Sequence, residues 1–291
     1  MSVSGKGQGA GQSGAFSFPA AGCRFVDYGQ PRVMGILNVT PDSFSDGGRY
    51  LKRERAIDHA ATLIREGADL LDIGGESTRP GATAVAVDEE LERVIPVIEA
   101  VRARFDVPIS IDTSKAEVMR AAVAAGADLI NDVYALRRTG ALEAAAESGA
   151  AVCLMHMQGE PRTMQEAPRY GDVVEEVARF LEERVAAALD AGISRDRLII
   201  DPGFGFGKTL EHNLELLRRL PELKRLGLPI LVGLSRKSMI GQLLDRSVAE
   251  RVPGSVTLAA LAVWQGAAIV RVHDVRETVE AVRITSAIRG R

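Results

Sequence analysis

The stretch LIIDPGFGFGKT, residues 198–209, joins a short apolar run to an acidic residue and then to a glycine-rich turn. An apolar or β-branched run bounded by turn signals is typical of a buried parallel strand. Seven other runs along the chain share this pattern. The eight predicted strands are VMGILNV (33–39), DLLDIG (69–74), PISID (108–112), LINDV (129–133), AVCLMH (151–156), LIIDPG (198–203), PILVGLS (229–235) and IVRVHD (269–274).

Amphipathic helical patterns separate these strands, and the clearest is predicted over residues 172–191. Its apolar residues recur near helical spacing, with charged residues opposite. They are Val173, Val177, Phe180, Val185 and Leu189. Strands that alternate with helices imply parallel βαβ units, and eight such units in roughly 250 residues fit a closed (β/α)8 barrel better than an open doubly wound sheet. The sequence therefore predicts an α/β fold built as a single TIM barrel.

The composition narrows the class of protein. Hydrophobic residues make up 46% and charged residues 26% of the 291 residues, as in an ordinary globular enzyme. A net charge of -3 gives no reason to expect nucleic acid or an anionic membrane as a partner. Cys23 and Cys153 are far apart and no CxxC pair is present, which favours a reducing, cytoplasmic setting without structural zinc.

The chain is expected to divide into a leader and one domain. Residues 1–22 are rich in Gly, Ser and Ala and lack the apolar segment of a signal peptide, so a disordered, flexible leader is expected there. Residues 23–291 contain no linker or shift in composition and are expected to form the barrel. No stretch approaches the roughly 20 apolar residues that a membrane span needs.

The glycine-rich turn DPGFGFGKT (201–209) raises the alternative of an ATP-binding module. A phosphate-binding loop has four residues between its first glycine and its Gly-Lys pair, but the residue at that distance before Gly207 is Pro202. The dinucleotide pattern fails as well, because Lys208 stands where its third glycine belongs. We therefore interpret these glycines as room for a flat substrate to approach the backbone.

Polar residues gather where the predicted strands end, which is the face on which barrel enzymes carry their chemistry. Asp112, Asn131 and Asp201 together offer carboxylates and an amide, which suit a flat heterocycle that displays both donors and acceptors. Each of them taken singly has an alternative role as a helix cap or a loop brace. Asp72 and Asp132 are expected to point differently along their strands and to be structural braces.

Cationic side chains also lie at strand ends. Arg271 and His273 are two residues apart on a strand, so both face the same way and could hold an anion, although an ion pair with Asp274 or Glu277 is an alternative. Lys237, directly after a buried strand, is expected at the barrel mouth. The role of His156, at the end of the fifth strand, stays open.

Asn38 and two long loop segments also have possible functional roles. Asn38 could help to hold Mg²⁺ if a diphosphate is present, and would otherwise be a turn residue. The segments 40–50 and 75–86 are long, glycine-bearing and rich in hydroxyl groups, as lids over active sites are, with ordinary surface loops as the alternative.

With these residues in view, the chain resembles the bacterial dihydropteroate synthase family of pterin-binding barrels. The motifs MGILNVTPDSFSDGG, GADLLDIGGESTRPGA, SIDTSK, NDV, CLMHMQG, DPGFGFGK, LVGLSRKS and RVHDV follow in that family's order. The similarity covers about residues 24 to 288. It implies a transferase of folate biosynthesis that joins (7,8-dihydropterin-6-yl)methyl diphosphate to p-aminobenzoate and releases pyrophosphate, requires Mg²⁺, forms a cytoplasmic homodimer and is a target of sulfonamides.

The resemblance also implies roles for individual residues. The pterin diphosphate would be bound by Thr78, Asp112, Asn131, Met155, Asp201, Lys237, Arg271 and His273, with Mg²⁺ at Asn38. The p-aminobenzoate pocket would be formed by Phe44, Thr78, Arg79, Pro80, Phe206 and Ser235. The catalytic residues would be Asp112, Arg79, Lys237 and Arg271.

One departure from the family pattern and two rival functions stay open. Tyr134 follows the NDV motif where the family leads us to expect a smaller or more polar residue. A pterin-dependent methyltransferase on the same barrel would bind a methyl donor and no diphosphate, and the STRPG, SRK and RVH motifs argue against it. A pterin-binding paralogue without synthase activity is the other alternative.

Overall fold

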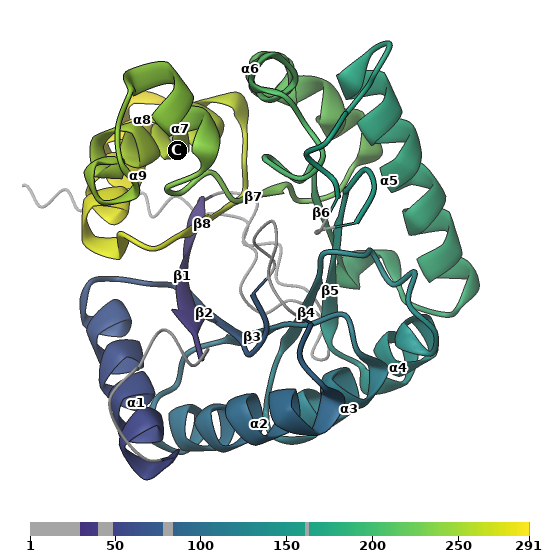
Figure 1. The fold of residues 1–291 in the computed structure, drawn as a ribbon, viewed down its shortest axis with the longest axis vertical. Helices are drawn as coiled ribbons and strands as arrows, with labels where there is room; N and C mark the ends of the chain where they lie inside the picture. The colour runs from purple at the N-terminus through teal and green to yellow at the C-terminus, as the bar shows by residue number, and fades with distance from the viewer. Residues whose placement is uncertain (1–29, 40–48, 78–83, 161–162, 291) are drawn as a thin grey trace, which may run out of the picture.

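A computed structural model describes residues 30–39, 49–77, 84–160 and 163–290 (Figure 1). Eight parallel strands follow the order β6-β5-β4-β3-β2-β1-β8-β7. A parallel bridge between Ile200 and Ile230 joins the β6 side to the β7 side, so the sheet closes on itself. The predicted (β/α)8 barrel is confirmed.

All eight predicted strands are present, most within a residue or two of the expected bounds. They are β1 (Arg32–Asn38), β2 (Leu70–Gly74), β3 (Ile109–Asp112), β4 (Leu129–Asp132), β5 (Ala151–Met155), β6 (Leu198–Asp201), β7 (Leu231–Val232) and β8 (Ile269–Val272). β7 is much shorter than the predicted 229–235. Pro229 has no N–H to donate, and a turn in which the Lys237 N–H bonds the Leu234 carbonyl ends the strand on its other side.

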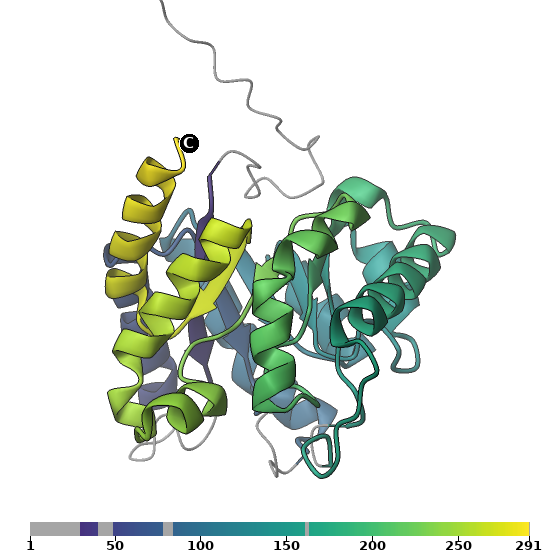
Figure 2. The ribbon, with the colours of Figure 1, turned by 90° about the horizontal axis from the view of Figure 1, so that it is seen from above.

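The helices surround the strands on the outside of the barrel, as Figures 1 and 2 show from two directions. They are α1 (Arg49–Arg65), α2 (Val87–Arg104), α3 (Ala116–Ala124), α4 (Ala141–Ser148), α5 (Val173–Asp190), α6 (Leu210–Arg218), α7 (Ser238–Leu244), α8 (Val252–Gln265) and α9 (Val275–Ile288). The described residues also form the 3₁₀ helices η2 (Arg195–Arg197), η3 (Leu220–Leu226) and η4 (Val248–Glu250). Within the described ranges, no helix is both long and apolar enough to cross a membrane.

The helix expected over residues 172–191 is confirmed as α5. Asp172 caps its N-terminus by accepting hydrogen bonds from the N–H groups of Val174 (2.9 Å) and Glu175 (3.1 Å). The predicted apolar stripe is wrong at one end, because Leu189 is 39% exposed. The face that packs on the barrel instead consists of Val173, Val174, Val177, Ala178, Leu181, Val185 and Ala188.

The barrel interior is filled in layers by side chains from alternate strand positions. Its apolar floor consists of Met34, Leu70, Leu129, Ala151, Cys153, Ile199, Leu231 and Ile269, all of which are almost completely buried. Two positions further along several strands, the inward side chains become polar. β2, β4, β6 and β8 then carry Asp72, Asn131, Asp201 and Arg271. The alternation of a strand therefore delivers these groups to the carboxyl-terminal mouth above an apolar floor.

A buried ion pair ties the loop after β2 to its neighbours. The Lys115 ammonium lies 2.6 Å from a carboxylate oxygen of Glu76 and also donates to Glu90, which is fully buried on α2. The other oxygen of Glu76 accepts from the N–H of Val85 at 3.1 Å. Glu76 therefore links the two described ends of the loop between β2 and α2.

Candidate active site

Arg271 occupies the centre of the barrel mouth and bonds two carboxylates. Its Nη2 donates to Asp112 at 2.8 Å and its Nε donates to Asp72. The same oxygen of Asp72 accepts from the Asn131 amide at 3.2 Å. The guanidinium of Arg271 thus links β8 to β2 and β3, and Asp72 extends the network to β4. This network brings together three of the residues that the sequence assigned to one site.

The predicted orientation of the Asp72 side chain is wrong. Asp72 points into the barrel, where it positions Arg271 and Asn131, and its second oxygen has no hydrogen-bond partner among the described residues. Its place on the inward face follows from its two-residue spacing from Leu70 of the apolar floor. Asp132 points outward and is a brace as expected, since it accepts from the N–H groups of Tyr134 (2.9 Å) and Leu136 (2.7 Å).

The charges at the mouth do not balance within this network. Two carboxylates share one guanidinium, and burial raises the pKa of Asp112 to about 7, while Arg271 opposes and Asp72 adds to that rise. The pKa of Arg271 is raised by the two carboxylates although burial opposes it. The ligand-free network therefore favours a ligand that brings positive charge or hydrogen-bond donors to Asp112.

A second pair of groups lies across the mouth. Asp201, at the end of β6, accepts from the N–H of Gly203 at 2.7 Å, and burial raises its pKa. The Lys237 ammonium donates to the carbonyl of Phe204 and lies 4.6 Å from the centre of the Phe206 ring. Burial lowers the pKa of Lys237 to about 8; the nearby Asp201 opposes this change and Arg271 adds to it.

Ser235 and His273 meet beside this pair. The Ser235 hydroxyl accepts from the backbone N–H of His273 (3.2 Å) and lies 3.0 Å from its Nδ1. The alternative of an ion pair from Arg271 to Asp274 or Glu277 is wrong, because Arg271 pairs with Asp72 and Asp112, and Asp274 bonds Arg236 through both oxygens. The backbone of Arg236 is in the left-handed region, with φ of 56°. The ion pair with Asp274 anchors the Arg236 side chain at this turn, which precedes Lys237.

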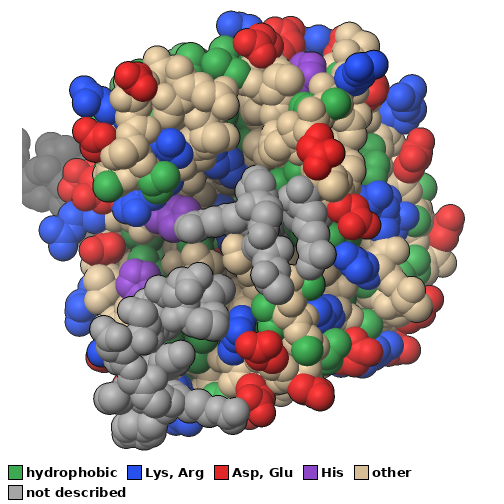
Figure 3. Space-filling view, in the orientation of Figure 1, with side chains coloured by type: hydrophobic (Ala, Val, Ile, Leu, Met, Phe, Trp, Pro, Cys, Tyr) green, Lys and Arg blue, Asp and Glu red, His purple; other side chains and the backbone are tan. Residues whose placement is uncertain are grey.

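An apolar wall completes the described part of the site. Met155 is 4% exposed and clusters with Val133, Met157 and Met164, with Tyr134 and Phe206 packed against them. Tyr134, the departure from the family pattern, also lies under the Arg138 guanidinium at 4.2 Å. Figure 3 shows this face of the molecule hollowed near its centre, with Lys or Arg side chains visible inside the hollow.

The glycines of the turn after β6 are needed for a reason that the sequence did not reveal. A Cβ on Gly203 would lie 1.8 Å from the carbonyl oxygen of His156, and one on Gly207 would lie 2.4 Å from that of Gln158. The close approach is therefore between two segments of the chain's own backbone. The interpretation of these two glycines as room for a substrate is corrected.

Asn38 ends β1 in register with Gly74, which is in turn in register with Asp112. It therefore lies at the same rim as the carboxylate network. Phe44, Thr78, Arg79 and Pro80 lie outside the described residues, as does the leader 1–22.

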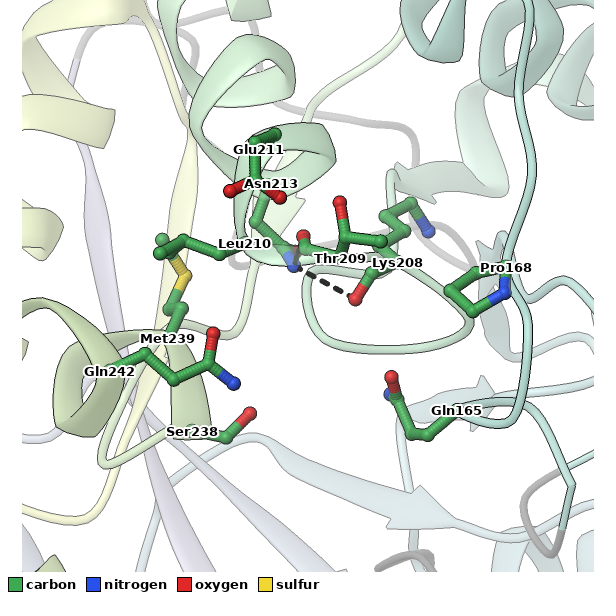
Figure 4. Close-up of a pocket in the computed structure, with 10 residues that line it drawn as sticks. All are labelled: Gln165, Pro168, Lys208, Thr209, Leu210, Glu211, Asn213, Ser238, Met239 and Gln242. Atoms are coloured by element: carbon green, nitrogen blue, oxygen red, sulfur yellow. Dashed lines mark hydrogen bonds between the residues drawn. The ribbon is translucent and has the colours of Figure 1, made fainter.

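A cavity of about 330 Å³ lies between α6 and α7 beside the turn. Figure 4 shows Gln165 facing Ser238 and Gln242 across it. Sequence reasoning missed this cavity, because its walls come from the segment after β5 and from α6 and α7, which only the folded barrel brings together. Its lining is Gln165, Pro168, Lys208, Thr209, Leu210, Glu211, Asn213, Ser238, Met239 and Gln242.

Comparisons with known proteins identify the family to which this chain belongs. Residues 34–273 match the family model described as pterin binding enzyme. The dihydropteroate synthase of Escherichia coli K12 is 58% identical over 262 residues, covering 90% of this chain and 93% of its own. The Haemophilus influenzae dihydropteroate synthase is 52% identical, with coverages of 90% and 95%.

Solved structures agree with these relatives. The Yersinia pestis dihydropteroate synthase in complex with a sulfonamide drug superposes with a TM-score of 0.88 at 55% identity, covering 91% of this chain and 97% of that one. The Xanthomonas albilineans dihydropteroate synthase in complex with 7,8-dihydropteroate gives a TM-score of 0.84 at 54% identity, with coverages of 91% and 96%.

The raised pKa of Asp112 predicts how stability depends on pH in the ligand-free protein. Between about pH 4 and pH 7 the unfolded chain loses the proton of this carboxyl group while the native state keeps it. The free energy of unfolding of the wild type should therefore fall, relative to that of Asp112→Asn, by up to about 1.4 kcal/mol per pH unit over this range. Denaturant unfolding of both proteins at several pH values measures the difference. A difference that stays constant between pH 4 and pH 7 would contradict it, and the exposed substitution Asp190→Asn serves as the control.

Proposed function

Because the chain belongs to the pterin-binding enzymes and, within them, to the dihydropteroate synthases, we propose that it joins (7,8-dihydropterin-6-yl)methyl diphosphate to p-aminobenzoate. The products are 7,8-dihydropteroate and pyrophosphate, so the chain is a transferase. One observation carries the assignment: a buried carboxylate, amide and guanidinium network lies at the barrel mouth of a chain that is 58% identical to a dihydropteroate synthase over nine-tenths of its length.

The pterin ring fits the described part of the mouth. Asp112, Asn131 and Asp201 offer acceptors and a donor amide to the polar edge of a flat heterocycle. Arg271 donates from Nε to Asp72 and from Nη2 to Asp112, and because N–H groups lie in the guanidinium plane, the face of the group would serve for stacking on the ring. Met155 supplies part of the apolar wall.

The reaction transfers the pterinylmethyl group from a diphosphate oxygen to the amine nitrogen of p-aminobenzoate. The C–O bond of the pterin methylene breaks, its electron pair leaves with the pyrophosphate, and positive charge is delocalised into the pterin ring. The amine nitrogen of p-aminobenzoate then forms the new C–N bond and loses a proton. This attack needs a positioned amine more than an activated one.

Asp112 is suited to stabilising the positive charge. In the ligand-free site its ionised form is disfavoured by burial and by competition with Asp72 for Arg271. A cation on the neighbouring methylene removes that imbalance, so the interaction is stronger in the transition state than in the ground state.

The leaving group requires a cationic binding site. Arg271 of β8 and His273, which directly follows this strand, are the described side chains that would hold the diphosphate. Among the described residues no cluster of three or more acidic, His or Cys side chains suits a metal, whereas Mg²⁺ usually takes one or two protein oxygens together with phosphate oxygens and water. The amide oxygen of Asn38 at the β1 rim fits this mode. When bound there with the substrate, Mg²⁺ would neutralise charge on the leaving group.

The arylamine pocket would lie on the Lys237 side of the mouth. Phe206 presents its ring beneath the Lys237 ammonium, and the Ser235 hydroxyl beside His273 can donate to a carboxylate. The remaining members proposed for this pocket, Phe44, Thr78, Arg79 and Pro80, lie outside the described residues. The Yersinia pestis relative binds a sulfonamide drug, and we propose that sulfonamides compete with p-aminobenzoate here as well.

A homodimer is the assembly that the surface favours. Leu261 and Trp264 of α8 and Ile284 and Ile288 of α9 are 47% to 69% exposed. The two helices lie side by side (Figure 1), so these large apolar side chains are presented by one region of the surface. We propose a second copy of this chain as its partner, because large exposed apolar side chains of this kind mark subunit interfaces.

Cys153 is a buried free thiol, which is in keeping with a cytoplasmic location.

The assay for the proposed activity is pyrophosphate release from the dihydropterin diphosphate by the purified protein. Release is expected only when p-aminobenzoate and Mg²⁺ are both present, and a sulfonamide should raise the apparent KM for p-aminobenzoate. Release that does not require p-aminobenzoate, or no product above background, would exclude a synthase. A paralogue that only binds pterin would bind the diphosphate substrate in the same experiment without turnover.

Asp112→Asn tests the charge at the reacting centre. The amide keeps the shape of the side chain but cannot stabilise a cation, so kcat should fall by about a hundredfold or more while the thermal midpoint stays the same or rises. Steady-state kinetics and calorimetry measure the two quantities, with Asp190→Asn on the exposed surface of α5 as control. Turnover close to that of the wild type would remove Asp112 from the mechanism.

Leu261→Glu tests the assembly. A charge in the centre of the apolar region should convert a dimer of 31.1 kDa chains into monomers, as measured by light scattering after size exclusion. The chain has one tryptophan, so the fluorescence maximum of Trp264 should shift to the red when the subunits separate. Leu189→Glu, on the exposed face of α5, is the matched control. A monomeric wild type, or an unchanged mass for Leu261→Glu, would refute this interface.

A further inference from the structure

Every backbone carbonyl of residues 203–207 accepts a hydrogen bond from a side chain. The donors come from four side chains, and two of them are lysines. The pairs are Lys208 with Gly203 (2.8 Å), Lys237 with Phe204, Gln165 with Gly205 (2.5 Å), Lys208 with Phe206 (3.1 Å) and the Tyr170 hydroxyl with Gly207 (2.8 Å). The turn thus directs its carbonyl oxygens at cations and other donors, which is the opposite polarity to a phosphate-binding loop.

The N–H groups of the turn are used inside the protein as well. Gly203 donates to Asp201 (2.7 Å), Gly205 donates to the Asn213 side chain (2.7 Å), and Phe206 donates to the Gly203 carbonyl (3.1 Å). These amides are therefore engaged before any anion arrives. The rejection of an ATP-binding module, made from glycine spacing, is supported by this hydrogen bonding.

Glycine at alternate positions produces this carbonyl pattern. Gly203, Gly205 and Gly207 have φ values of 68°, 79° and 61°, in the left-handed region that other residues avoid. The chain therefore curls around the Lys208 side chain, and two carbonyls that are three residues apart converge on one nitrogen.

Lys208 is the centre of the turn. It is 3% exposed, and its Nζ makes three contacts, with the two carbonyls and with Nδ1 of His156 at 2.9 Å. An ammonium group has three N–H bonds, so these contacts account for all of its donors. His156 is itself buried after β5, where its ring makes a T-shaped contact with the ring of Phe180, with 4.9 Å between the ring centroids.

The protonation of this pair fits the same contacts. Burial, together with the nearby Lys208 charge, lowers the pKa of His156 to about 2, so the imidazole is neutral. Burial also lowers the pKa of Lys208 well below its ordinary value. A neutral amine would still donate to both carbonyls while accepting from Nδ1–H of His156. The geometry of the turn is therefore held in either protonation state of Lys208.

The turn also supplies two elements of the arylamine side of the site. The Phe204 carbonyl holds Lys237, and the Phe206 ring lies 4.6 Å from the Lys237 ammonium. We propose that Lys208 is a positioning residue, which gathers the Gly203 and Phe206 carbonyls and so fixes Phe206 and Lys237 for the arylamine substrate. This proposal rests on the function proposed above. Lys208 is not assigned a catalytic role, since its contacts are all internal.

The test compares Lys208→Met with the wild type. Methionine fills much of the same space but leaves both carbonyls and Nδ1 of His156 without their donor. The KM for p-aminobenzoate should rise by at least about tenfold, as expected for the loss of hydrogen bonds to a charged group, with a smaller change in the KM for the pterin diphosphate. Amide hydrogen exchange should accelerate in peptides that cover residues 201–210 and remain slow in those of α2.

Two further variants separate positioning from general destabilisation. Val101→Ala removes fully buried side-chain volume from α2, and should lower the thermal midpoint without changing the KM for p-aminobenzoate or exchange in the turn. Tyr170→Phe removes only the hydroxyl that bonds Gly207 and keeps the ring against His156 and His212. It should raise the same KM by a smaller factor.

The outcomes are distinguishable. An inactive wild type would refute the proposed function, and exchange in the turn would still test the role of Lys208. An active wild type with unchanged KM and unchanged exchange in Lys208→Met would overturn the proposal. If Lys208→Met does not fold, Lys208→Gln, which keeps an amide donor, replaces it, and unchanged values in both Lys208→Gln and Tyr170→Phe would overturn the proposal equally.

Discussion

One guanidinium shared by two buried carboxylates is the interaction on which the mouth of this barrel depends. Arg271 joins Asp72 on β2 and Asp112 on β3, and Asp72 in turn bonds Asn131 on β4. Burying such charges is costly unless they are paired, and here one pair is always incomplete. That deficit is what a substrate that develops positive charge can relieve. The sharing of one guanidinium by two carboxylates therefore suits the proposed transition state.

Buried lysines solve a related problem on the other side of the mouth. Lys208 and Lys237 both lie among backbone carbonyls of the same glycine-rich turn, so their desolvation is offset by oriented dipoles and by the nearby Asp201. The turn needs glycine at 203 and 207 because it passes close to the backbone after β5. Its conformation, its two lysines and the placement of Phe206 are consequences of one another.

Much of the fold could be read from local pattern. Eight apolar runs with polar ends predicted eight strands, and an apolar stripe at helical spacing predicted α5 to within one residue at each end. β7 was shorter than expected, because Pro229 and the turn at Lys237 limit its hydrogen bonding, which is not visible in hydrophobicity. Leu189 was misplaced because the buried face of α5 continues from Val185 to Ala188, three residues on, and leaves Leu189 exposed. The location of Asp112, Asn131, Asp201, Lys237 and Arg271 at the barrel mouth was predicted from their positions at strand ends.

The sequence by itself determined the barrel, the end at which its polar groups meet, and the family motifs that carry them, since these depend on residue type and on short-range spacing. Only the tertiary structure decided which groups touch. Asp72 and Arg271 are 199 residues apart, and Lys208 and His156 are 52 apart. No local pattern encodes such contacts, because they exist only when the closed sheet brings distant strand ends to one mouth. The glycine-rich turn shows the difference most clearly: its spacing excluded a phosphate loop, but only the closed barrel revealed that its carbonyls enclose a buried lysine.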